Sequence, residues 1–321
     1  MTETVTSLTT QTSAYDEEIA ALLAGLGSTQ KTISPKYFYD ERGSELFEKI
    51  TTLPEYYPTR TELGILYENI GEIGVALGED VSLIELGAGA STKVRVLLDH
   101  LANVIVFVPV DISGDHLHAA ADELATDYPN IEILPVAADF TRPFPLPHPK
   151  KMPARNILFF PGSTIGNFSP PDALKLLRTM RTVAKIGGGL LIGVDLQKES
   201  DVIERAYNDS AGVTAAFNRN MLVHLNREFG MDFDINGFEH TARYNTQLHR
   251  IEMHLVSLRE QAVTLADQTF HFAKGETLLT ECSHKYTIEG FTALAAEAGF
   301  RVDQVWTDHD QLFSVHYATA V

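Results

Sequence analysis

Apolar runs separated by amphipathic stretches dominate residues 80–195. The runs cover Val81–Leu86, Val104–Val110, Ile131–Val136, Asn156–Phe160 and Gly189–Val194. Runs without strict alternation are typical of strands buried on both faces, as in a parallel sheet. The stretches between them, Ser91–Leu101, Asp115–Asp127 and Pro171–Lys185, have helical periodicity. This order predicts an α/β fold in which helices cover a parallel sheet.

The pattern changes after Asp195. Residues 199–229 have helical character, and between Phe233 and Tyr286 apolar and polar residues alternate as in antiparallel strands. The tail predicts one more helix, Ile288–Ala298, and a strand pair, Arg301–Thr307 and Gln311–Thr319. We therefore predict a discontinuous core, residues 61–195 completed by 287–321, and an α+β substrate-binding subdomain made of residues 10–60 and 196–286.

The composition of the chain limits the classes of partner that it is expected to bind. The chain has 321 residues, 43 of them acidic and 25 basic, which gives a net charge of −18. Nucleic acids and anionic lipids are bound mainly through Lys and Arg, so this balance argues against both partners. The single cysteine, Cys282, excludes an internal disulfide and fits a reducing cytoplasm. We expect a cytoplasmic monomer that acts on a small molecule, with no nucleic acid and no membrane as partner.

The first predicted strand leads into a glycine-rich turn, Glu85-x-Gly87-x-Gly89. Glycines let the backbone bend sharply and let a ligand approach closely, and open α/β sheets bind ligands at the carboxyl ends of their strands. Asp111 ends the second strand, where a carboxylate can accept both hydroxyls of a ribose. Asp139 and Phe140 follow the third strand, as an acceptor for an adenine amino group and a ring that stacks on the base. An incidental turn, a helix cap at Asp139 and a core aromatic at Phe140 are the alternatives.

The glycine pattern of this turn distinguishes between two classes of cofactor. A nicotinamide-binding fingerprint needs glycine at position 92, which is Thr92 here. The acidic-x-Gly-x-Gly form, the Asp-Phe pair and the Gly187–Gly189 turn are common in methyltransferases, which favours S-adenosylmethionine (SAM). The twelve histidines include no H-x-x-x-H pair with a nearby third ligand, and His116 and His118 face different ways on a helix. We therefore predict no metal site.

Methyl transfer from a sulfonium needs an attacking group held in line, more than it needs a nucleophile on the protein. An amine that attacks must be neutral, and aromatic rings tolerate the methylated cation through cation–π contact. Tyrosines of this kind cluster at residues 37–40 and 54–60, and we take Tyr39 and Tyr56 as catalytic candidates. The alternative is that these tyrosines only cover the sheet.

Three further segments supply candidates for substrate binding. Asn167 follows the fourth strand in Gly162–Asn167, where its amide can face a substrate carboxylate. Glu281 and Ser283 lie two residues apart on a predicted strand, so their side chains share a face and could read the two nitrogens of an imidazole. Cys282 then points away as packing. Met253 lies on a neighbouring strand and is a candidate for shaping a ring pocket; a solvent-facing strand edge is the alternative.

Four longer strings carry a resemblance to a known family. They are Pro35–Asp40, Leu53–Glu62, Gly162–Asn167 and Ala211–Asn220. They closely resemble the L-histidine Nα-methyltransferases of ergothioneine biosynthesis, and the likeness runs from about residue 30 to the C-terminus. It implies a Rossmann-like class I methyltransferase core, with a mostly parallel seven-stranded sheet and helices on both faces. It also implies three successive methyl transfers from SAM to one amine, giving trimethylhistidine (hercynine).

The resemblance also implies roles for single residues. Those for SAM are Tyr56, Gly87, Lys93, Asp111, Asp139 and Phe140, with Lys93 on the methionyl carboxylate. Those for histidine are Tyr56, Asn167, Tyr207, Glu281 and Ser283, and Tyr39 would help orient the amine. Asn167 and Tyr207 would hold the substrate carboxylate. Fungal relatives methylate tryptophan-type amines, which is the alternative; an indole offers one donor and would leave a buried Glu281 under-satisfied.

Overall fold

The computed structural model describes residues 3–89, 92–112 and 114–321, without the side chains of residues 3–14, 92, 115 and 116. Ala90 and Ser91 of the predicted turn and helix, and the side chain of His116, lie outside the described part. The chain divides into two compact units. Unit 1 consists of Met1–Tyr56 and Ser200–Cys282, and unit 2 of Tyr57–Glu199 and Ser283–Val321.

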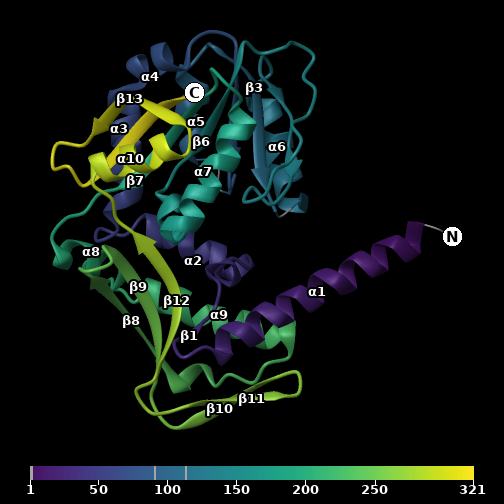
Figure 1. The fold of residues 1–321 in the computed structure, drawn as a ribbon, viewed down its shortest axis with the longest axis vertical. Coiled ribbons are helices and arrows are strands. Elements are labelled where there is room, and N and C mark those ends of the chain that lie inside the picture. The colour runs from purple at the N-terminus through teal and green to yellow at the C-terminus, as the bar shows by residue number, and fades with distance from the viewer. Residues whose placement is uncertain (1–2, 90–91, 113) are drawn as a thin grey trace. The chain divides into compact units, whose positions relative to one another are not determined.

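Unit 2 is built on one large sheet (Figure 1). Its order is β13 (Phe300–Thr307), β14 (Phe313–Ala320), β7 (Gly189–Asp195), β6 (Arg155–Phe160), β2 (Val81–Leu86), β3 (Val104–Asp111) and β4 (Glu132–Ile133), with β5 (Val136–Ala137) also paired to β3. Strands β2 to β7 pair in parallel, whereas β14 is antiparallel to both of its neighbours. The predicted Rossmann-like sheet is confirmed.

One predicted strand, Ile131–Val136, is wrong in detail because it is two short strands, β4 and β5. Proline has no N–H to donate, so the ladder cannot continue through Pro135. The backbone N–H of Leu134 still reaches the carbonyl of Phe107 at 2.9 Å, and that of Ala138 reaches Asp111 at 2.9 Å. Two short strands, β4 and β5, therefore both pair with β3 and together take the place of one of the seven predicted strands.

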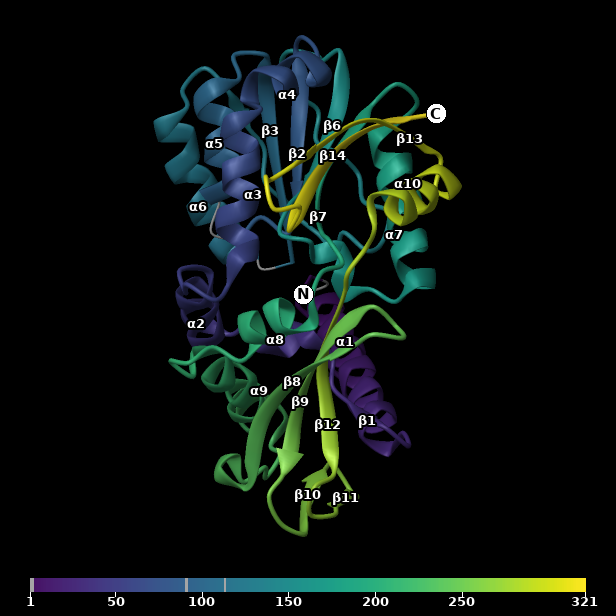
Figure 2. The same ribbon diagram turned by 90° about the vertical axis from the view of Figure 1, so that its left-hand side faces the viewer.

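Helices cover both faces of this sheet (Figure 2). Helices α3 (Tyr57–Glu68), α4 (Ile70–Leu77), α5 (Thr92–His100) and α6 (Gly114–Asp127) supply one apolar cluster, and α7 (Pro170–Ala184) and α10 (Ile288–Glu297) the other. Leu83 of β2 joins the first cluster and Ile84 the second. All six residues of β2 are buried, which explains why its sequence shows no alternation.

Unit 1 combines a mixed sheet with helices: β8 is antiparallel to β9, whereas β1 is parallel to β12. The sheet order is β1 (Lys31–Thr32), β12 (Thr277–His284), β9 (Arg250–Ser257) and β8 (Phe238–Asn245), and β10 (Gln261–Leu265) pairs with β11 (Gln268–Phe272) as a separate hairpin. The helices are α1 (Glu3–Gly27), α2 (Glu41–Thr51), α8 (Ser200–Tyr207) and α9 (Val213–Phe229), with short 3₁₀ turns η1 (Pro35–Phe38) and η3 (Ile235–Gly237). Strand β12 runs from unit 1 into unit 2, because its last two residues belong to the latter.

The predicted single helix over residues 199–229 is instead two helices, α8 and α9. They are separated at Gly212, whose φ of +71° is in the left-handed region that favours glycine. Asp209 caps the second helix, since its carboxylate accepts from the backbone N–H groups of Val213 and Thr214 at 2.8 and 2.7 Å. Local capping chemistry therefore overrides continuous helical periodicity here.

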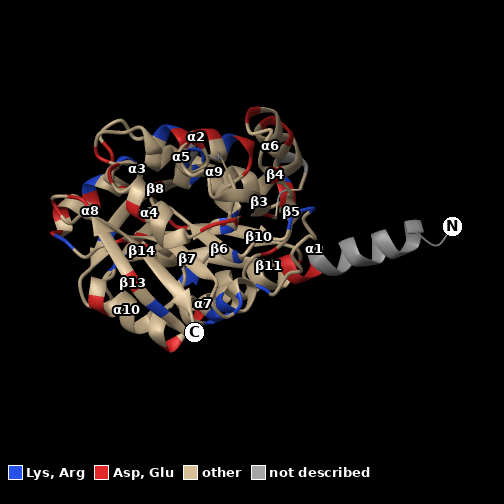
Figure 3. Cartoon of the chain, turned by 90° about the horizontal axis from the view of Figure 1, so that it is seen from above, with Lys and Arg blue, Asp and Glu red and all other residues tan. Residues whose placement is uncertain are grey.

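Charge is distributed unevenly over the helices (Figure 3). Helix α6 carries Asp122, Glu123 and Asp127 and contains no Lys or Arg, whereas α2 carries both acidic and basic residues.

None of the described helices combines the length and the apolar character that a bilayer crossing requires.

Candidate functional site

The glycine turn follows β2 in unit 2 and is hydrogen-bonded to the end of β3. Gly87 has a φ of +73°, a conformation that L side chains rarely adopt. The backbone N–H groups of Gly87 and Ala88 both donate to the carbonyl of Val110, at 2.9 and 3.1 Å. Asp111 is the next residue, so the turn and this carboxylate are fixed side by side at the carboxyl edge of the sheet.

The ring of Phe140 also lies at this edge of the sheet, beside the glycine turn. A Cβ placed on Gly87 would lie 3.6 Å from Phe140 Cε1, an ordinary contact, so the ring borders the turn. The ring also packs edge-on against Phe160, with centroids 5.6 Å apart, and lies against the core. Gly87, Asp111 and Phe140 thus come together as predicted neighbours, while Phe140 also has the packing role left open as its alternative.

Asp139 has a local role. Its Oδ1 accepts from the backbone N–H and the hydroxyl of Thr141, at 2.9 and 2.6 Å, which is a turn-capping arrangement. Its side chain is 43% exposed, so the carboxylate remains open to a ligand. The adenine contact of Asp139 stays a prediction.

Lys93 is held by a residue that the sequence analysis did not single out for the site. Its Nζ lies 2.6 Å from Oε2 of Glu62, a side chain only 1% exposed. Both oxygens of Glu62 also accept from the backbone N–H of Gly162, at 3.0 and 2.9 Å. A Cβ on Gly193 would lie 1.9 Å from Glu62 Oε1, so only glycine leaves room for this carboxylate. Glu62 therefore ties Lys93 to the loop that leads to Asn167.

Glu85, just before the turn, is buried with one carboxylate oxygen that has no hydrogen-bond partner among the described residues. Burial raises its pKa to about 8; Lys93 acts to lower the pKa, and Glu62 and Asp111 act to raise it. Three carboxylates and one lysine therefore share this corner, which makes the proton on Glu85 sensitive to any charge that binds there.

Asn167 ends η2 (Thr164–Asn167), which docks on the last residues of β12. A Cβ on Gly166 would lie 2.7 Å from the carbonyl oxygen of His284 and 3.1 Å from Oγ of Ser283. His284 Nδ1 lies 2.9 Å from the carbonyl of Gly166. The structure thus places the Asn167 loop against Ser283, two segments that lie far apart in the sequence.

Unit 1 contains a small pocket of its own, formed mainly by aromatic and apolar side chains. Its lining residues are Phe47, Ile50, Tyr56, Ala206, Tyr207, Thr214, Phe217, Met253 and Glu281. Four of the predicted substrate residues, Tyr56, Tyr207, Met253 and Glu281, therefore meet around one cavity. Glu281 supplies the carboxylate of this lining.

Tyr39 packs against two of the side chains that line the pocket. Its ring centroid lies 5.7 Å from that of Phe47 and 5.8 Å from that of Phe217, both edge-on, and the residue is 48% exposed. The exposed fraction is that of the whole residue, whereas its hydroxyl is buried; this burial raises the pKa of the hydroxyl above the usual range, and Glu281 and Tyr207 add to the shift. The hydroxyl is therefore a protonated donor at neutral pH.

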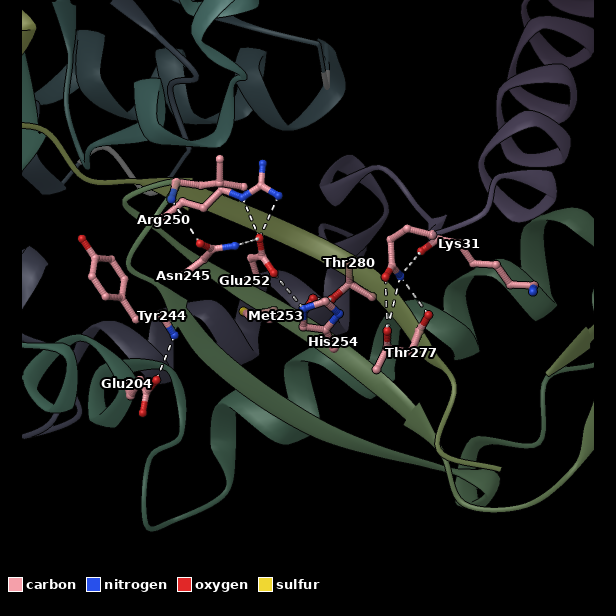
Figure 4. Close-up of polar contacts among 12 residues, drawn as sticks. Lys31, Glu204, Tyr244, Asn245, Arg250, Glu252, Met253, His254, Thr277 and Thr280 are labelled. Atoms are coloured by element: carbon pink, nitrogen blue, oxygen red, sulfur yellow. Dashed lines mark hydrogen bonds and ion pairs between the residues drawn. The ribbon is translucent and has the colours of Figure 1, made fainter. Parts of the chain in front are cut away.

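Met253 lies on β9 and lines the pocket; Figure 4 shows it among residues that make polar contacts on this part of the sheet. It is 2% exposed, and its carbonyl accepts from the Thr280 hydroxyl at 3.0 Å. The other face of β9 carries a polar network in which Glu252 pairs with Arg250 at 2.7 Å and with His254 at 3.3 Å. Strand alternation along β9 thus places Glu252, which has structural partners, on the face opposite to Met253.

Phe47, Thr214 and Phe217 are pocket residues that sequence reasoning missed. Phe217 and Thr214 lie within the string Ala211–Asn220 that carried the family resemblance, which was the available signal. Helical periodicity places such residues on a buried face but cannot tell a core contact from a pocket wall. Within the described ranges, no three His, Cys, Asp or Glu side chains are grouped as a metal site would need.

Comparison with known proteins identifies the family. The family described as histidine-specific, SAM-dependent methyltransferases matches residues 18–320. This chain belongs to that family. A histidine N-alpha-methyltransferase of Mycolicibacterium smegmatis is 45% identical over 89% of each chain. Ergothioneine biosynthesis protein 1 of Schizosaccharomyces pombe is 29% identical over 82% of this chain and 36% of its own length. An L-tryptophan methyltransferase of Psilocybe serbica is 28% identical over 90% of this chain and 89% of its own.

Membership confirms three predictions. The chain is a methyltransferase, SAM is its methyl donor, and its family is the histidine-specific one that the four strings resemble. The individual contacts to SAM and to substrate remain predictions, and they form the basis of the proposal below.

Proposed function

We propose that this chain transfers methyl groups from SAM to the α-amino nitrogen of L-histidine, three times in succession, to give trimethylhistidine. The observation that carries the acceptor is the unit 1 pocket, in which a single carboxylate, Glu281, stands among aromatic and apolar walls. Histidine-specific methyltransferases of this family support the same substrate.

The residues at the sheet edge fit a SAM molecule. Gly87 leaves the turn open without a side chain, and Asp111 lies at the end of the neighbouring strand. We propose that Asp111 holds the ribose, Asp139 and Phe140 the adenine, and Lys93 the methionyl carboxylate. When bound, SAM supplies an electrophilic methyl group on a sulfonium.

The pocket residues would position the acceptor. Glu281 accepts an imidazole N–H, Met253 contacts the ring, and Tyr207 with Asn167 would hold the substrate carboxylate. Tyr39 and Tyr56 would orient the neutral amine toward the methyl group. Since each transfer leaves a more methylated, cationic nitrogen, the rings around the pocket stabilise the product through cation–π contacts of about 0.5–2 kcal/mol.

The tryptophan alternative is not favoured. An indole is a larger ring without a nitrogen lone pair, and the pocket walls are already bulky, with Phe47, Met253 and Phe217. The buried hydroxyl of Ser283 would then have no acceptor on the ring, which costs about 1–3 kcal/mol.

The test is direct. Purified protein, SAM and either L-histidine or L-tryptophan are incubated, and products are identified by mass spectrometry. We expect histidine to gain one, two and three methyl groups without added metal. Methylated tryptophan with unchanged histidine would overturn the proposal.

We further propose that the product enters ergothioneine biosynthesis and that the enzyme works as a cytoplasmic monomer, without nucleic acid or membrane partners. The ergothioneine relative and the acidic composition support this assignment. Light scattering of the purified protein tests the monomer.

A further inference from the structure

Unit 2 contains a buried charge cluster at the end of β7. Asp195, Lys285 and Lys198 have side chains that are 1%, 1% and 8% exposed. Asp195 binds Lys285 through Oδ2 at 2.7 Å and Lys198 through Oδ1 at 2.6 Å. Burial acts to raise the pKa of Asp195, but the two lysines lower it overall, so the carboxylate stays ionised. Two buried ammonium groups thus share one carboxylate.

The two lysines differ in what else they touch. Lys198 donates to the Tyr57 hydroxyl at 2.7 Å and to the carbonyl of Leu196 at 2.5 Å. Lys285 donates to Oγ of Ser283 at 3.0 Å. Lys285 therefore connects this cluster to Ser283, a residue of the proposed substrate site.

The contact with Lys285 decides whether the Ser283 hydroxyl can donate or accept a further hydrogen bond. An ammonium group has donors and no acceptor, so the contact with Lys285 uses a lone pair of the Ser283 oxygen. The hydroxyl proton must then point to another acceptor, and none is present among the residues that the structure describes. Ser283 is 3% exposed, so water does not replace that acceptor freely. The hydroxyl is preset to donate.

We propose that Lys285 is a positioning residue that makes Ser283 an obligatory hydrogen-bond donor, so that the site selects the neutral imidazole of its substrate. This inference rests on the proposed function. A neutral ring has one N–H and one lone pair, which suit an accepting Glu281 and a donating Ser283. An imidazolium has no lone pair, so it leaves the Ser283 proton without a partner.

The other titratable and charged groups near the Asp195 cluster lie on several elements. Asp195 and Lys198 are at the end of β7, Tyr57 is on α3, His284 is on β12, and Asp308 lies between β13 and β14. Each is retained when Lys285 alone is changed. Lys198→Met is the matched control, because it removes the other buried ammonium from Asp195 and leaves the Lys285–Ser283 contact intact.

The experiment measures the affinity of trimethylhistidine by calorimetry at pH 8 and pH 5.5, with S-adenosylhomocysteine present. The quaternary amine of this probe does not titrate. With an imidazole pKa of about 6.5, a site that takes only the neutral ring loses about tenfold in affinity at the lower pH. We expect this loss in the parent protein and in Lys198→Met, and less than about threefold in Lys285→Met.

Ser283→Ala, with Lys285 intact, separates the hydroxyl from the charge and serves if Lys285→Met does not fold. It should flatten the pH dependence in the same way. A tenfold loss retained in Lys285→Met or in Ser283→Ala would overturn the inference, as would equal flattening in Lys198→Met. If the parent protein binds neither histidine nor trimethylhistidine at any pH, the proposed function itself fails.

Discussion

The two units build their candidate sites from different materials. In unit 2 the groups at the sheet edge are a glycine and charged side chains, such as Gly87 and Asp111, fixed by the ends of adjacent strands. In unit 1 the pocket is walled by rings from α2, α8 and α9 and closed by Met253 and Glu281 on two strands. The first arrangement suits a ligand rich in hydroxyl and charged groups, the second an apolar ring with one or two donors.

In the proposed assignment, the cofactor residues Gly87, Asp111 and Phe140 belong to unit 2, whereas the acceptor residues Met253 and Glu281 belong to unit 1. If the comparison is right, a single substitution should weaken the binding of one ligand and leave the affinity for the other unchanged. The following predictions run from the largest expected effect to the smallest.

Asp111→Ala should remove SAM binding most strongly. Losing a carboxylate that accepts two ribose hydroxyls costs about 3 kcal/mol, or about a hundredfold in affinity. Calorimetry with S-adenosylhomocysteine measures it, and Asp122→Ala on the exposed side of α6 is the control. Equal affinity in both variants would remove Asp111 from the cofactor site.

Glu281→Ala should weaken histidine binding by about tenfold to thirtyfold while SAM affinity stays unchanged, since about 1.5–2 kcal/mol is lost with a charged acceptor. Glu252→Ala changes a carboxylate of the same sheet that is paired with Arg250 on the other face. Weakening by both variants alike would show a general effect on unit 1 rather than a contact.

Glu85→Gln should change how stability depends on pH. The pKa of buried Glu85 is raised to about 8, so between about pH 4.5 and 8 the folded state holds a proton that the unfolded state has lost. This group therefore favours folding at low pH, and its contribution falls as pH rises toward 8. The parent protein should lose up to about 1.4 kcal/mol per pH unit relative to the variant. Denaturant melts at several pH values measure the difference, and parallel curves would contradict it.

Phe217→Leu should weaken trimethylhistidine binding more than histidine binding, by about fivefold, because about 1 kcal/mol of cation–π contact is lost. Phe233→Leu is the control, since this ring packs with Phe238 and Phe272 rather than in the pocket. An equal loss for both ligands would indicate packing alone.

Cys282→Ser should have the smallest effect. Burial raises the pKa of this thiol to about 11, so it is not a nucleophile at neutral pH. We expect a turnover rate within about twofold of the parent protein, because an inert packing residue tolerates a near-isosteric change. A tenfold fall in methyl transfer would give Cys282 a role in the site.

Sequence alone determined the features that depend on neighbouring residues. Continuous apolar runs predicted the strands of unit 2, because burial on both faces removes alternation, as in β2. The glycine of a left-handed turn and the acid that ends the next strand are local requirements, so Gly87 and Asp111 were found as a cofactor pattern. Asn167 was a candidate because it follows the fourth strand, whereas Tyr207 came only from the family resemblance, since no local rule would identify it.

Tertiary structure decided what depends on residues far apart in the chain. The contact of Glu62 with Lys93 and Gly162 joins three segments, and the pocket gathers Phe47 and Phe217 onto Glu281. The contact from Lys285 to Ser283 depends on Asp195, which lies some distance earlier in the chain. Helical and strand periodicity record only that a side chain is buried, whereas its partner is set by packing and by the need to pair buried polar groups. For that reason the sequence predicted the cofactor and the family of this protein, and the fold decided which buried charges pair with one another.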